Sequence, residues 1–398
     1  MPSLITRAGR YVKQPAGYRA FIPAPLPPEP PVQLDQRMVA LLSRADQSVG
    51  RLDGVTQTLP NPDLFVAMYV RREAVLSSQI EGTQSSLDDV LAFELDPRSK
   101  DLPRDVEEVV NYVRAMNYGL RRLASLPLSL RLIREIHAEL LHGVRGADRR
   151  PGEFRVSQNW IGPGSVPLSQ ATFVPPPAAD MLRSLDNFER FLHEEREMPV
   201  LIHAGLAHAQ FETIHPFLDG NGRVGRLLIT FLLCHRGVLH RPLLYLSYYL
   251  KRHRAEYYDR LMAIREEGNW EGWLRFFLRG AEETAREATD TAKAILRLRE
   301  MHWALIEKQG MGPNSLRLLD LLFERPLVHV KLVKNRLGLA FVTANKLVEQ
   351  LEGLGLLEEI TGGQRNRIFR YVPYLTLIQD REPTPSEDVP VQATEADE

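Results

Sequence analysis

The chain has 398 residues, of which 44% are hydrophobic and 25% are charged, and its formal net charge is −1. This is the composition of an ordinary globular protein with room for two or three domains. The near-zero net charge excludes a whole-protein attraction to nucleic acid or anionic lipid, so any such attraction must come from a local patch. The single cysteine, Cys234, excludes an internal disulfide and a multi-cysteine metal site, and it favours a reducing cytoplasm.

No apolar run approaches the roughly 20 residues that a membrane helix needs. The N-terminal sequence MPSLITRAGRYVKQ lacks the apolar block of a secretory signal. We therefore expect a cytoplasmic protein without a membrane segment.

The first 60 residues are expected to form a proline-rich strap and an N-terminal helix. Residues 1–33 include AFIPAPLPPEPP, which favours an extended, polyproline-like path, and a helical pattern begins at Gln36. In the next region, 61–100, one helix ends at Gly82. A second helix follows with a capping-box spacing from Ser85 to Asp88.

Residues 101–311 are expected to form a mostly helical core. Helical patterns cover residues 104–123, 129–143, 178–195, 200–214, 223–236, 252–267 and 270–308. One β-like island interrupts them: the runs FRVSQNWI and ATFV lie within residues 152–177 and flank a Gly/Pro/Ser loop, which predicts a small hairpin. The fold class is therefore mainly α with a small β-hairpin.

Past the Gly-Pro-Asn boundary, residues 312–375 are expected to form a winged-helix domain. Three short helical patterns precede two strand-like runs around a Gly-Gly turn, which is the winged-helix pattern. Residues 317–370 hold nine Lys/Arg and six Asp/Glu, a mild basic surplus for a DNA-binding element. The tail 376–398 is acidic and poor in apolar residues, so we expect it to be disordered.

The stretch 214-IHPFLDGNGRVGR-226 concentrates polar and flexible residues before an apolar helix. Pro216 disfavours helix at His215, so the imidazole is expected on a loop that Phe217 pins to the core. Gly220, Asn221 and Gly222 are able to point successive backbone N–H groups into a hollow at the start of that helix. Together with the positive end of the helix dipole, this predicts an anion site of the phosphate-binding kind.

Three charged side chains refine this prediction. Arg223 and Arg226 are three residues apart on the first helical turn, so both are able to reach one polyphosphate. Asp219 would repel phosphate unless a hard cation such as Mg²⁺ lay between them. The sequence thus predicts a magnesium–nucleotide site beside a histidine that takes a proton from an attacking hydroxyl. A rival interpretation is zinc bound by His208, Glu212 and His215, although Pro216 tilts His215 off the helical face.

HPFLDGNGRVGR resembles the signature of the Fic (filamentation induced by cAMP) family, with every fixed position filled, and the likeness covers roughly residues 60–305. It implies the helical Fic fold and transfer of AMP from ATP to a protein Ser, Thr or Tyr hydroxyl, with release of pyrophosphate. By this resemblance His215 is the general base and Asp219 holds Mg²⁺. The residues that bind the phosphates are Gly220, Asn221, Gly222, Arg223 and Arg226.

The stretch 77-SSQIEG-82 places Ser77 and Glu81 on one face of a helix that Gly82 caps. It resembles the self-inhibition motif of the same family, which implies that Glu81 pairs with Arg226 and keeps it from the γ-phosphate. By itself the stretch is equally compatible with a helix end that carries a solvated acid.

Two further groups of residues are assigned through the resemblance. The run Thr172, Phe173, Val174 and Pro175 resembles the Fic flap, where a strand edge would align an extended target segment. Tyr248 and Tyr249 are candidates for the wall of the adenine pocket, and core packing at helical spacing is the alternative for both.

The sequence therefore predicts a protein adenylyltransferase that uses ATP and Mg²⁺ and is inhibited in cis. Its target is a protein hydroxyl, the chain itself being one candidate, and a homodimer and DNA contact through the winged helix are further candidate interactions. The alternatives are a DNA-binding regulator whose core only senses nucleotide, and an enzyme of the same fold that uses another nucleotide donor or removes AMP.

Overall fold

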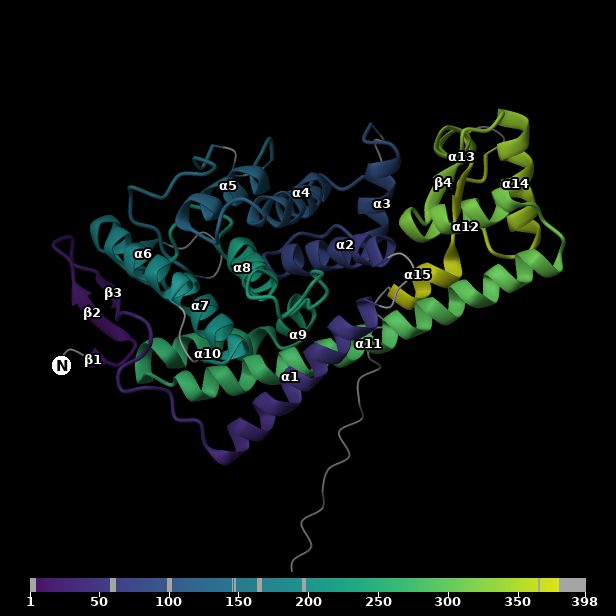
Figure 1. The fold of residues 1–398 in the computed structure, drawn as a ribbon. Coiled ribbons are helices and arrows are strands. Elements are labelled where there is room, and N and C mark those ends of the chain that lie inside the picture. The colour runs from purple at the N-terminus through teal and green to yellow at the C-terminus, as the bar shows by residue number, and fades with distance from the viewer. Residues whose placement is uncertain are drawn as a thin grey trace, which may run out of the picture.

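A computed structural model describes residues 5–57, 62–98, 102–144, 146, 148–162, 167–194, 198–363 and 366–378. Helices dominate it, and two small antiparallel sheets lie near the two ends of the chain (Figure 1). The helices before the C-terminal region are α1 (Gln36–Gln57), α2 (Pro62–Ile80), α3 (Leu87–Leu95), α4 (Val106–Leu123), α5 (Leu130–Leu140), a 3₁₀ turn (Leu168–Gln170), α6 (Ala178–His193), α7 (Val200–Ile214), α8 (Asn221–His235), α9 (Ser247–Arg252), α10 (Arg254–Glu267) and α11 (Trp270–Lys308).

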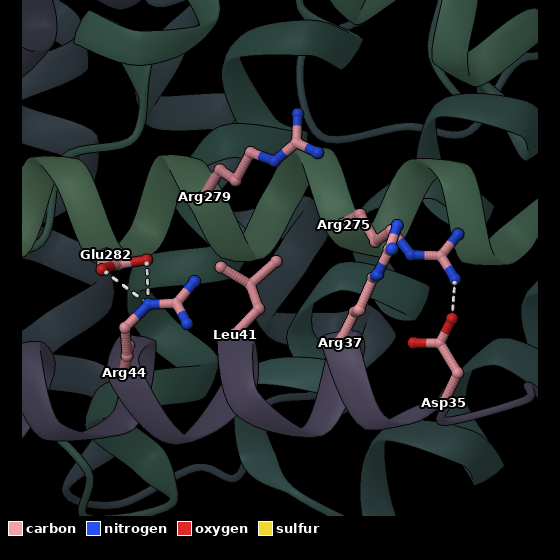
Figure 2. Close-up of a pocket in the computed structure, with 7 residues that line it drawn as sticks. All are labelled: Asp35, Arg37, Leu41, Arg44, Arg275, Arg279 and Glu282. Atoms are coloured by element: carbon pink, nitrogen blue, oxygen red, sulfur yellow. Dashed lines mark hydrogen bonds and ion pairs between the residues drawn. The ribbon is translucent and has the colours of Figure 1, made fainter.

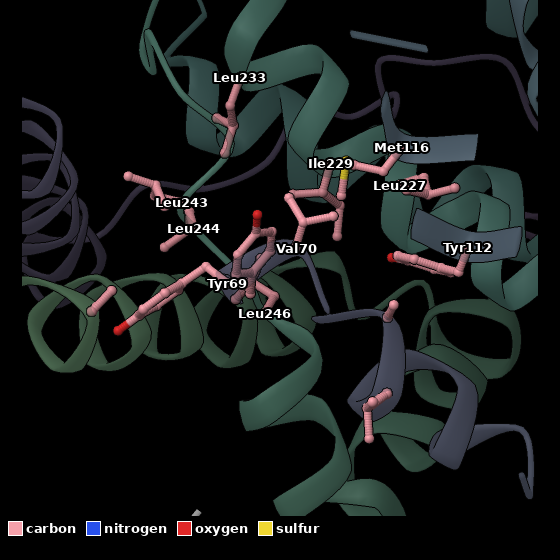
Figure 3. Packing of buried hydrophobic residues seen from close by; sticks show 14 of the residues in the cluster. Tyr69, Val70, Tyr112, Met116, Leu227, Ile229, Leu233, Leu243, Leu244 and Leu246 are labelled. Carbon is pink, nitrogen blue, oxygen red and sulfur yellow. The ribbon is translucent and has the colours of Figure 1, made fainter. Parts of the chain in front are cut away.

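The centre of the molecule is built from α7 and α8, which are buried on nearly every side. All residues of α7 from Leu201 to Ile214 are buried. The first thirteen residues of α8, from Asn221, are buried as well. Such all-round burial requires cover from every direction. Figure 3 shows part of this core, where Tyr69 and Val70 of α2, Tyr112 and Met116 of α4, Leu227, Ile229 and Leu233 of α8, and Leu243, Leu244 and Leu246 pack together. Helix α11 runs beneath this core and continues to the C-terminal region (Figure 1).

The predicted proline-rich strap is partly wrong. The described residues from Ile5 form a three-stranded sheet of β1 (Ile5–Thr6), β2 (Gly9–Lys13) and β3 (Arg19–Pro23) in the order β1-β2-β3. Its strands pair because Phe21 gains a buried place against Phe173, with ring centroids 6.0 Å apart. Residues 24–35 carry the prolines and have no regular hydrogen-bonded structure.

The predicted hairpin at 152–177 is present only as a single β-bridge among the described residues. The described parts of the two runs meet at one isolated bridge, in which Ile161 N–H donates to Phe173 O (2.8 Å) and Phe173 N–H donates to Ile161 O (3.0 Å). No ladder extends from it in the described residues, because Arg155 N–H donates to Pro216 O instead (2.9 Å) and the prolines at 175–177 have no N–H. The first run therefore packs against the loop of the motif.

The capping box of α3 lies one residue later than predicted. Ser86 is the N-cap and pairs reciprocally with Asp89. Ser85 instead donates its hydroxyl to Asp105, and Asp88 pairs with Arg370 from the C-terminal region. Ser85 and Ser86 are adjacent, as are Asp88 and Asp89, so local spacing allows either capping box and the long-range partners decide between them.

The C-terminal module, residues 313–378, contains α12 (Pro313–Glu324), β4 (Leu327–His329), α13 (Val330–Leu337), α14 (Phe341–Gly353), β5 (Glu358–Glu359), β6 (Ile368–Arg370) and α15 (Val372–Ile378). Its sheet has the order β4-β6-β5. This element order is compatible with a winged helix, which stays a prediction. Residues 376–378 belong to α15 and not to a disordered tail, because Tyr374, Leu375 and Ile378 are buried. Residues 379–398 lie outside the described residues.

No helix within the described ranges is both long enough and apolar enough to cross a bilayer.

Candidate functional site

His215 lies on the loop that follows α7, in the position predicted from Pro216. It caps the helix in the left-handed region, with φ 48° and ψ 60°. This conformation is costly for a residue with a Cβ and persists only where neighbours hold it. Arg155 Nε–H donates to His215 O (3.0 Å), and Asn159 Nδ2–H donates to the same oxygen (3.2 Å). Two side chains from the reduced hairpin thus hold the backbone of His215.

The imidazole of His215 is neutral. Burial, together with the charges of Arg155 and Arg265, lowers its pKa to about 3. Within the described parts of the chain, its Nδ1 is buried and has no hydrogen-bond partner. A neutral imidazole with an unengaged nitrogen is able to accept a proton, as a general base requires.

The floor of the loop is a stacked ring pair that sequence analysis did not find. His137 of α5 stacks on Phe217, with centroids 3.7 Å apart and planes 6° apart. Its Nδ1 accepts from Gly152 N–H (2.8 Å), which leaves Nε2 to donate to Asp219 O (3.0 Å). Burial lowers the pKa of His137 to about 4, so a neutral imidazole supports the motif loop from below. A buried histidine in a helical pattern gives no local signal of such a contact.

The glycine-rich turn differs in detail from the prediction. Only Gly220 has a positive φ (77°), where it is the N-cap of α8, and the helix begins at Asn221 and not near Arg223. Asn221 turns its side chain back: Oδ1 accepts from Phe217 N–H (2.8 Å) and Nδ2–H donates to Phe217 O (2.9 Å). Asn221 and Phe217 therefore shape the loop with side chains that are already engaged, and only backbone N–H groups of the turn remain to meet an anion.

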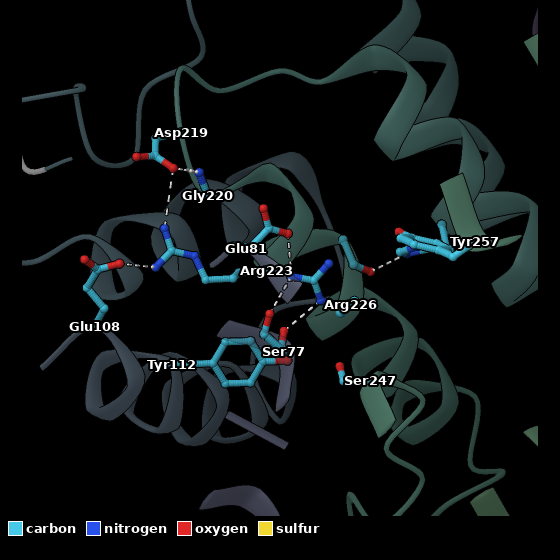
Figure 4. Close-up of polar contacts among 12 residues, drawn as sticks. Ser77, Glu81, Glu108, Tyr112, Asp219, Gly220, Arg223, Arg226, Ser247 and Tyr257 are labelled. Atoms are coloured by element: carbon cyan, nitrogen blue, oxygen red, sulfur yellow. Dashed lines mark hydrogen bonds and ion pairs between the residues drawn. The ribbon is translucent and has the colours of Figure 1, made fainter. Parts of the chain in front are cut away.

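A carboxylate lies directly on the start of α8. A Cβ built on Gly222 would be 2.1 Å from Glu81 Oε1. That oxygen also accepts from Arg226 Nη2–H (2.7 Å), while Arg226 Nε–H donates to Ser77 Oγ (2.7 Å) and Nη2–H to Ser77 O (3.0 Å) (Figure 4). Although burial works in the opposite direction, Arg226 holds the pKa of Glu81 below its usual value. Glu81 is thus an anion seated where the sequence predicts a phosphate.

Arg223 and Asp219 form the other half of the site (Figure 4). The buried guanidinium of Arg223 lies between Glu108 Oε2 (3.4 Å) and Asp219 Oδ1 (3.5 Å), and in the described residues its Nε has no hydrogen-bond partner. Asp219 Oδ1 also accepts from Gly220 N–H (2.6 Å). The Asp219 side chain is 38% exposed, so a cation can reach it from solvent.

Two buried glutamates lie close to the guanidinium of Arg226: Glu73, which sequence analysis missed, and Glu212, which it considered only as a zinc ligand. Glu73 of α2 accepts from Tyr112 and Ser247, and burial raises its pKa to about 7. Glu212 of α7 lies against Gly225, where a Cβ would be 2.4 Å from Oε1, and burial raises its pKa to about 7 as well. Arg226 therefore faces three carboxyl groups, of which Glu81 makes the direct ion pair.

The zinc interpretation is not supported by the geometry. His208 donates through Nδ1 to Gly225 O (2.9 Å), so its Nε2 accepts from Tyr257 O–H (2.9 Å), and both nitrogens are engaged. No group of three or more His, Cys, Asp or Glu side chains suited to a metal occurs among the described residues.

The remaining predicted residues are placed as follows. Tyr249 is buried against Phe276 (5.1 Å) and His253 (4.4 Å), which favours the core-packing alternative over the wall of the adenine pocket. Tyr248 lies under Arg72, whose guanidinium carbon is 5.1 Å from the ring centroid. Among the described residues, the ring of Tyr248 lies near Arg72 and Arg252, and the ring of Tyr249 lies near His253 and Phe276, away from the motif loop. Gly82 follows Glu81 with φ 100°.

The predicted flap residues are mostly buried. Phe173 and Val174 are 2% and 7% exposed. Val174 O accepts from Phe21 N–H (2.9 Å), and Pro175 O accepts from Gln158 Nε2–H (2.9 Å). The edge at Thr172 to Pro175 is therefore largely used by this chain itself, through β3.

A charged pocket of about 650 Å³ lies between α1 and α11, apart from the motif (Figure 2). It is lined by Asp35, Arg37, Leu41, Arg44, Arg275, Arg279 and Glu282. Ion pairs cross it from Asp35 to Arg275 (2.8 Å) and from Arg44 to Glu282 (3.1 Å), so part of its charge ties the two helices together.

Two family descriptions match consecutive parts of the chain. Residues 39–121 match the Fic/DOC family N-terminal region, and residues 127–233 match the Fic/DOC family. The first match contains Ser77 and Glu81, and the second contains the whole motif from His215 to Arg226.

Similar proteins carry the same family name. Protein adenylyltransferase Fic of Drosophila ananassae is 31% identical over 180 residues, which is 44% of this chain and 33% of that protein. The protein of the same name in Aedes aegypti is 34% identical over 160 residues, or 39% of this chain and 28% of that protein. The chain therefore spans about a third of the length of these curated relatives.

Solved structures share the fold. A Fic family protein from Desulfovibrio desulfuricans superposes with a TM-score of 0.57 at 20% identity, covering 86% of this chain and 97% of that one. A Fic domain containing signaling protein from Bacteroides thetaiotaomicron gives 0.50 at 17% identity, covering 63% and 97%. The region from residue 39 to residue 233, which contains Glu81 and the motif from His215 to Arg226, thus belongs to the Fic/DOC family.

Proposed function

We propose that this protein transfers AMP from ATP to a hydroxyl of a protein and that Glu81 inhibits the reaction in cis. The observation that carries the proposal is the position of the Glu81 carboxylate on Gly222 and Arg226. An anion already occupies the start of α8, so the backbone and the guanidinium there suit a phosphate group equally well. The names of the similar adenylyltransferases support the same chemistry.

In the proposed reaction, His215 accepts the proton of the target hydroxyl through an imidazole nitrogen. The hydroxyl oxygen then forms a bond to the α-phosphorus of ATP, and the bond from that phosphorus to the bridging oxygen breaks, which releases pyrophosphate. Arg223, Arg226 and the backbone N–H groups of the turn stabilise the charge on the phosphates. Because burial keeps His215 neutral, no deprotonation is needed before it acts.

The residues of the site fit Mg²⁺. Asp219 offers a half-exposed carboxylate, and Mg²⁺ in nucleotide sites takes one or two carboxylates together with phosphate oxygens and waters. When bound, the metal would neutralise phosphate charge beside Asp219. Asp219 would hold it from one side while Arg223, already 3.5 Å from that carboxylate, keeps the carboxylate in place.

We propose that the target segment contacts the run 154–161 more than the run 172–175. Val156 and Trp160 are 71% and 41% exposed, and Asn159 between them is bonded to His215 O and Phe217 O. An apolar side chain of the target resting on Val156 and Trp160 would therefore lie next to the catalytic loop. The buried run 172–175 keeps a supporting role.

The release of inhibition is the direct test. Glu81→Gly should label a target or the chain itself with one AMP in the presence of ATP and Mg²⁺, and intact mass spectrometry detects the added mass. Glu81→Gly/His215→Ala should not label, because no base remains. Glu81→Gly labelling that is no faster than that of the unaltered chain would refute the inhibitory role, and labelling without His215 would refute the mechanism.

DNA contact, dimer formation, self-modification and a cytoplasmic location are separate proposals, and each has its own test. The proposal of DNA contact rests on the element order of the C-terminal module, which is compatible with a winged helix. Salt-dependent binding of a DNA duplex would support DNA contact, whereas AMP labelling without such binding would support the enzyme and contradict DNA contact. A homodimer and self-modification are tested by light scattering and by labelling of the isolated chain. A cytoplasmic location fits the single cysteine and ATP as substrate.

A further inference from the structure

The C-terminal module packs against both helices that flank Glu81. Helices α12 and α15 contact α2, and strand β4 contacts α3. Figure 1 shows this module beside α2 and α3, at the end of α11. Glu81 and Gly82 lie in the connection between these two helices. The module therefore touches both arms of the turn that carries the inhibitory carboxylate.

One arm is held by an ion pair. Arg370, the last residue of β6, places Nη2 3.2 Å and 2.9 Å from the two carboxylate oxygens of Asp88 in the first turn of α3. The two side chains are 27% and 42% exposed. Asp88 is seven positions beyond Glu81, so this contact fixes the start of α3 close to the turn.

The other arm is held by helix packing, since α12 and α15 both contact α2. Tyr374 of α15 is fully buried. Phe323 of α12 packs on Tyr374 with ring centroids 4.8 Å apart. Arg71 of α2 forks onto Glu94 of α3 (2.9 and 2.8 Å), which joins the two arms to each other.

The turn is held at its far end by Asp105 before α4, which accepts from Gln84 N–H (2.6 Å) and from the Ser85 hydroxyl, and at its near end by backbone bonds to α2. Glu81 N–H donates to Ser78 O (3.0 Å), Gly82 N–H to Gln79 O (3.1 Å) and Thr83 N–H to Ser78 O (3.3 Å). These are bonds within one helix end, so they move together with α2. The place of Glu81 relative to Gly222 therefore depends on what holds α2 and α3 against the rest of the molecule.

We propose that the C-terminal module is a brace for the inhibitory turn: its contacts with α2 and α3 hold Glu81 on Arg226. Loosening the module then lets the turn move and frees Arg226 for phosphate. This inference rests on the proposed function for its effect on catalysis, but the mechanical part, the restraint on the turn, can be measured without catalysis.

Arg370→Asp tests the brace, because it sets two carboxylates against each other across the module and α3. The matched control is Arg367→Asp immediately before the same strand, since Arg367 pairs with Glu349 inside the module (3.6 Å). For a half-exposed pair we expect the amides of residues 81–83 to exchange hydrogen about two- to five-fold faster in Arg370→Asp. Transfer of AMP should rise by about the same factor. Arg367→Asp should change neither.

Two further variants make the result specific. Asp88→Arg/Arg370→Asp restores opposite charges and should return both exchange and transfer towards the original values. In the Glu81→Gly background, Arg370→Asp should leave transfer unchanged, because the inhibitory carboxylate is already gone.

Each outcome decides between distinct explanations. Unchanged exchange at residues 81–83 in Arg370→Asp overturns the brace, as does an equal increase in Arg367→Asp, which would indicate general loosening of the module. Faster exchange that the charge swap reverses, with no transfer even from Glu81→Gly, supports the brace and overturns the proposed function. Faster transfer from Arg370→Asp in the Glu81→Gly background overturns the link between the brace and Glu81.

Discussion

Replacing Arg155 with methionine should destabilise the protein and weaken the loop that carries His215. The buried guanidinium donates to His215 O (3.0 Å), Ser157 O (3.1 Å) and Pro176 O (2.6 Å). His215 O keeps its bond from Asn159 (3.2 Å), so the substitution leaves two carbonyls without these donors. The carbonyl of the buried Pro176 is left without a donor, which costs about 1–3 kcal/mol, whereas Ser157 is exposed and its carbonyl is able to accept from water. Burial lowers the pKa of Arg155 to about 10, which shows that the charge is itself unfavourably placed. We therefore expect a loss of about 2–3 kcal/mol in the free energy of unfolding.

Urea denaturation followed by tryptophan fluorescence measures this loss. Arg134→Met is the matched control, because Arg134 is exposed and donates one hydrogen bond, to Gly152 O (2.7 Å). It should cost about 0.5 kcal/mol. In the Glu81→Gly background, Arg155→Met should also lower AMP transfer, since the left-handed backbone of His215 loses an anchor. Equal losses of stability from the two substitutions would refute the anchoring role.

Three other predictions follow from the site and the core. The pKa of His215 is about 3 in the folded chain and 6.5 ordinarily, so between these pH values the unfolded chain binds a proton that the folded chain does not. The free energy of unfolding should therefore fall as the pH drops from 6.5 to 3. Replacing His215 with Gln should flatten this pH dependence, as measured by urea denaturation. Gly119→Ala places a Cβ 2.4 Å from Phe231 Cζ between α4 and α8, and should lower the free energy of unfolding by about 1–3 kcal/mol in thermal melts, whereas a neutral result would contradict the close approach. Chelation by EDTA, or Asp219→Asn, should abolish labelling by Glu81→Gly while the circular dichroism spectrum stays unchanged, and labelling that survives EDTA would contradict a metal at Asp219.

The residues of the motif were predictable because their chemistry is local. The order of His215, Asp219 and the glycine-rich turn along the chain already places a base, a carboxylate and a phosphate cradle next to one another. The i, i+4 spacing of Ser77 and Glu81 likewise places both on one helical face. Helices with clear periodicity were predicted well for the same reason, and α11 runs from Trp270 to Lys308 within the predicted range.

The rest of the site depends on contacts between distant segments. Arg155 and Asn159 lie in a run that reads as a strand, and only its packing on the motif loop shows why two polar side chains are buried there. His137 meets Asp219 across 82 positions of sequence. The helical pattern alone predicts a core position for His137. No spacing in the sequence distinguishes a histidine that supports the motif loop from one that is simply packed in the core.

One contact, between Phe21 and Val174, explains why the predictions of the hairpin and of the strap were both partly wrong. β-rich composition suggested that the two runs within 152–177 pair with each other, whereas the second run pairs in part with β3 through Phe21 and Val174. Short strands at the N-terminus carry little periodic signal, and their prolines suggested an extended strap. Two weak local preferences were thus decided by a single tertiary contact.

The close approach of Glu81 to Gly222 restricts which substitutions the protein can accept. The few ångströms above its Cα hold the Glu81 oxygen, and in the proposed reaction the same space holds a nucleotide phosphate. No side chain added there can evict one anion and admit the other. Variation that tunes the resting activity is therefore directed away from the catalytic turn and towards Ser77, Glu81 and the surfaces that support them.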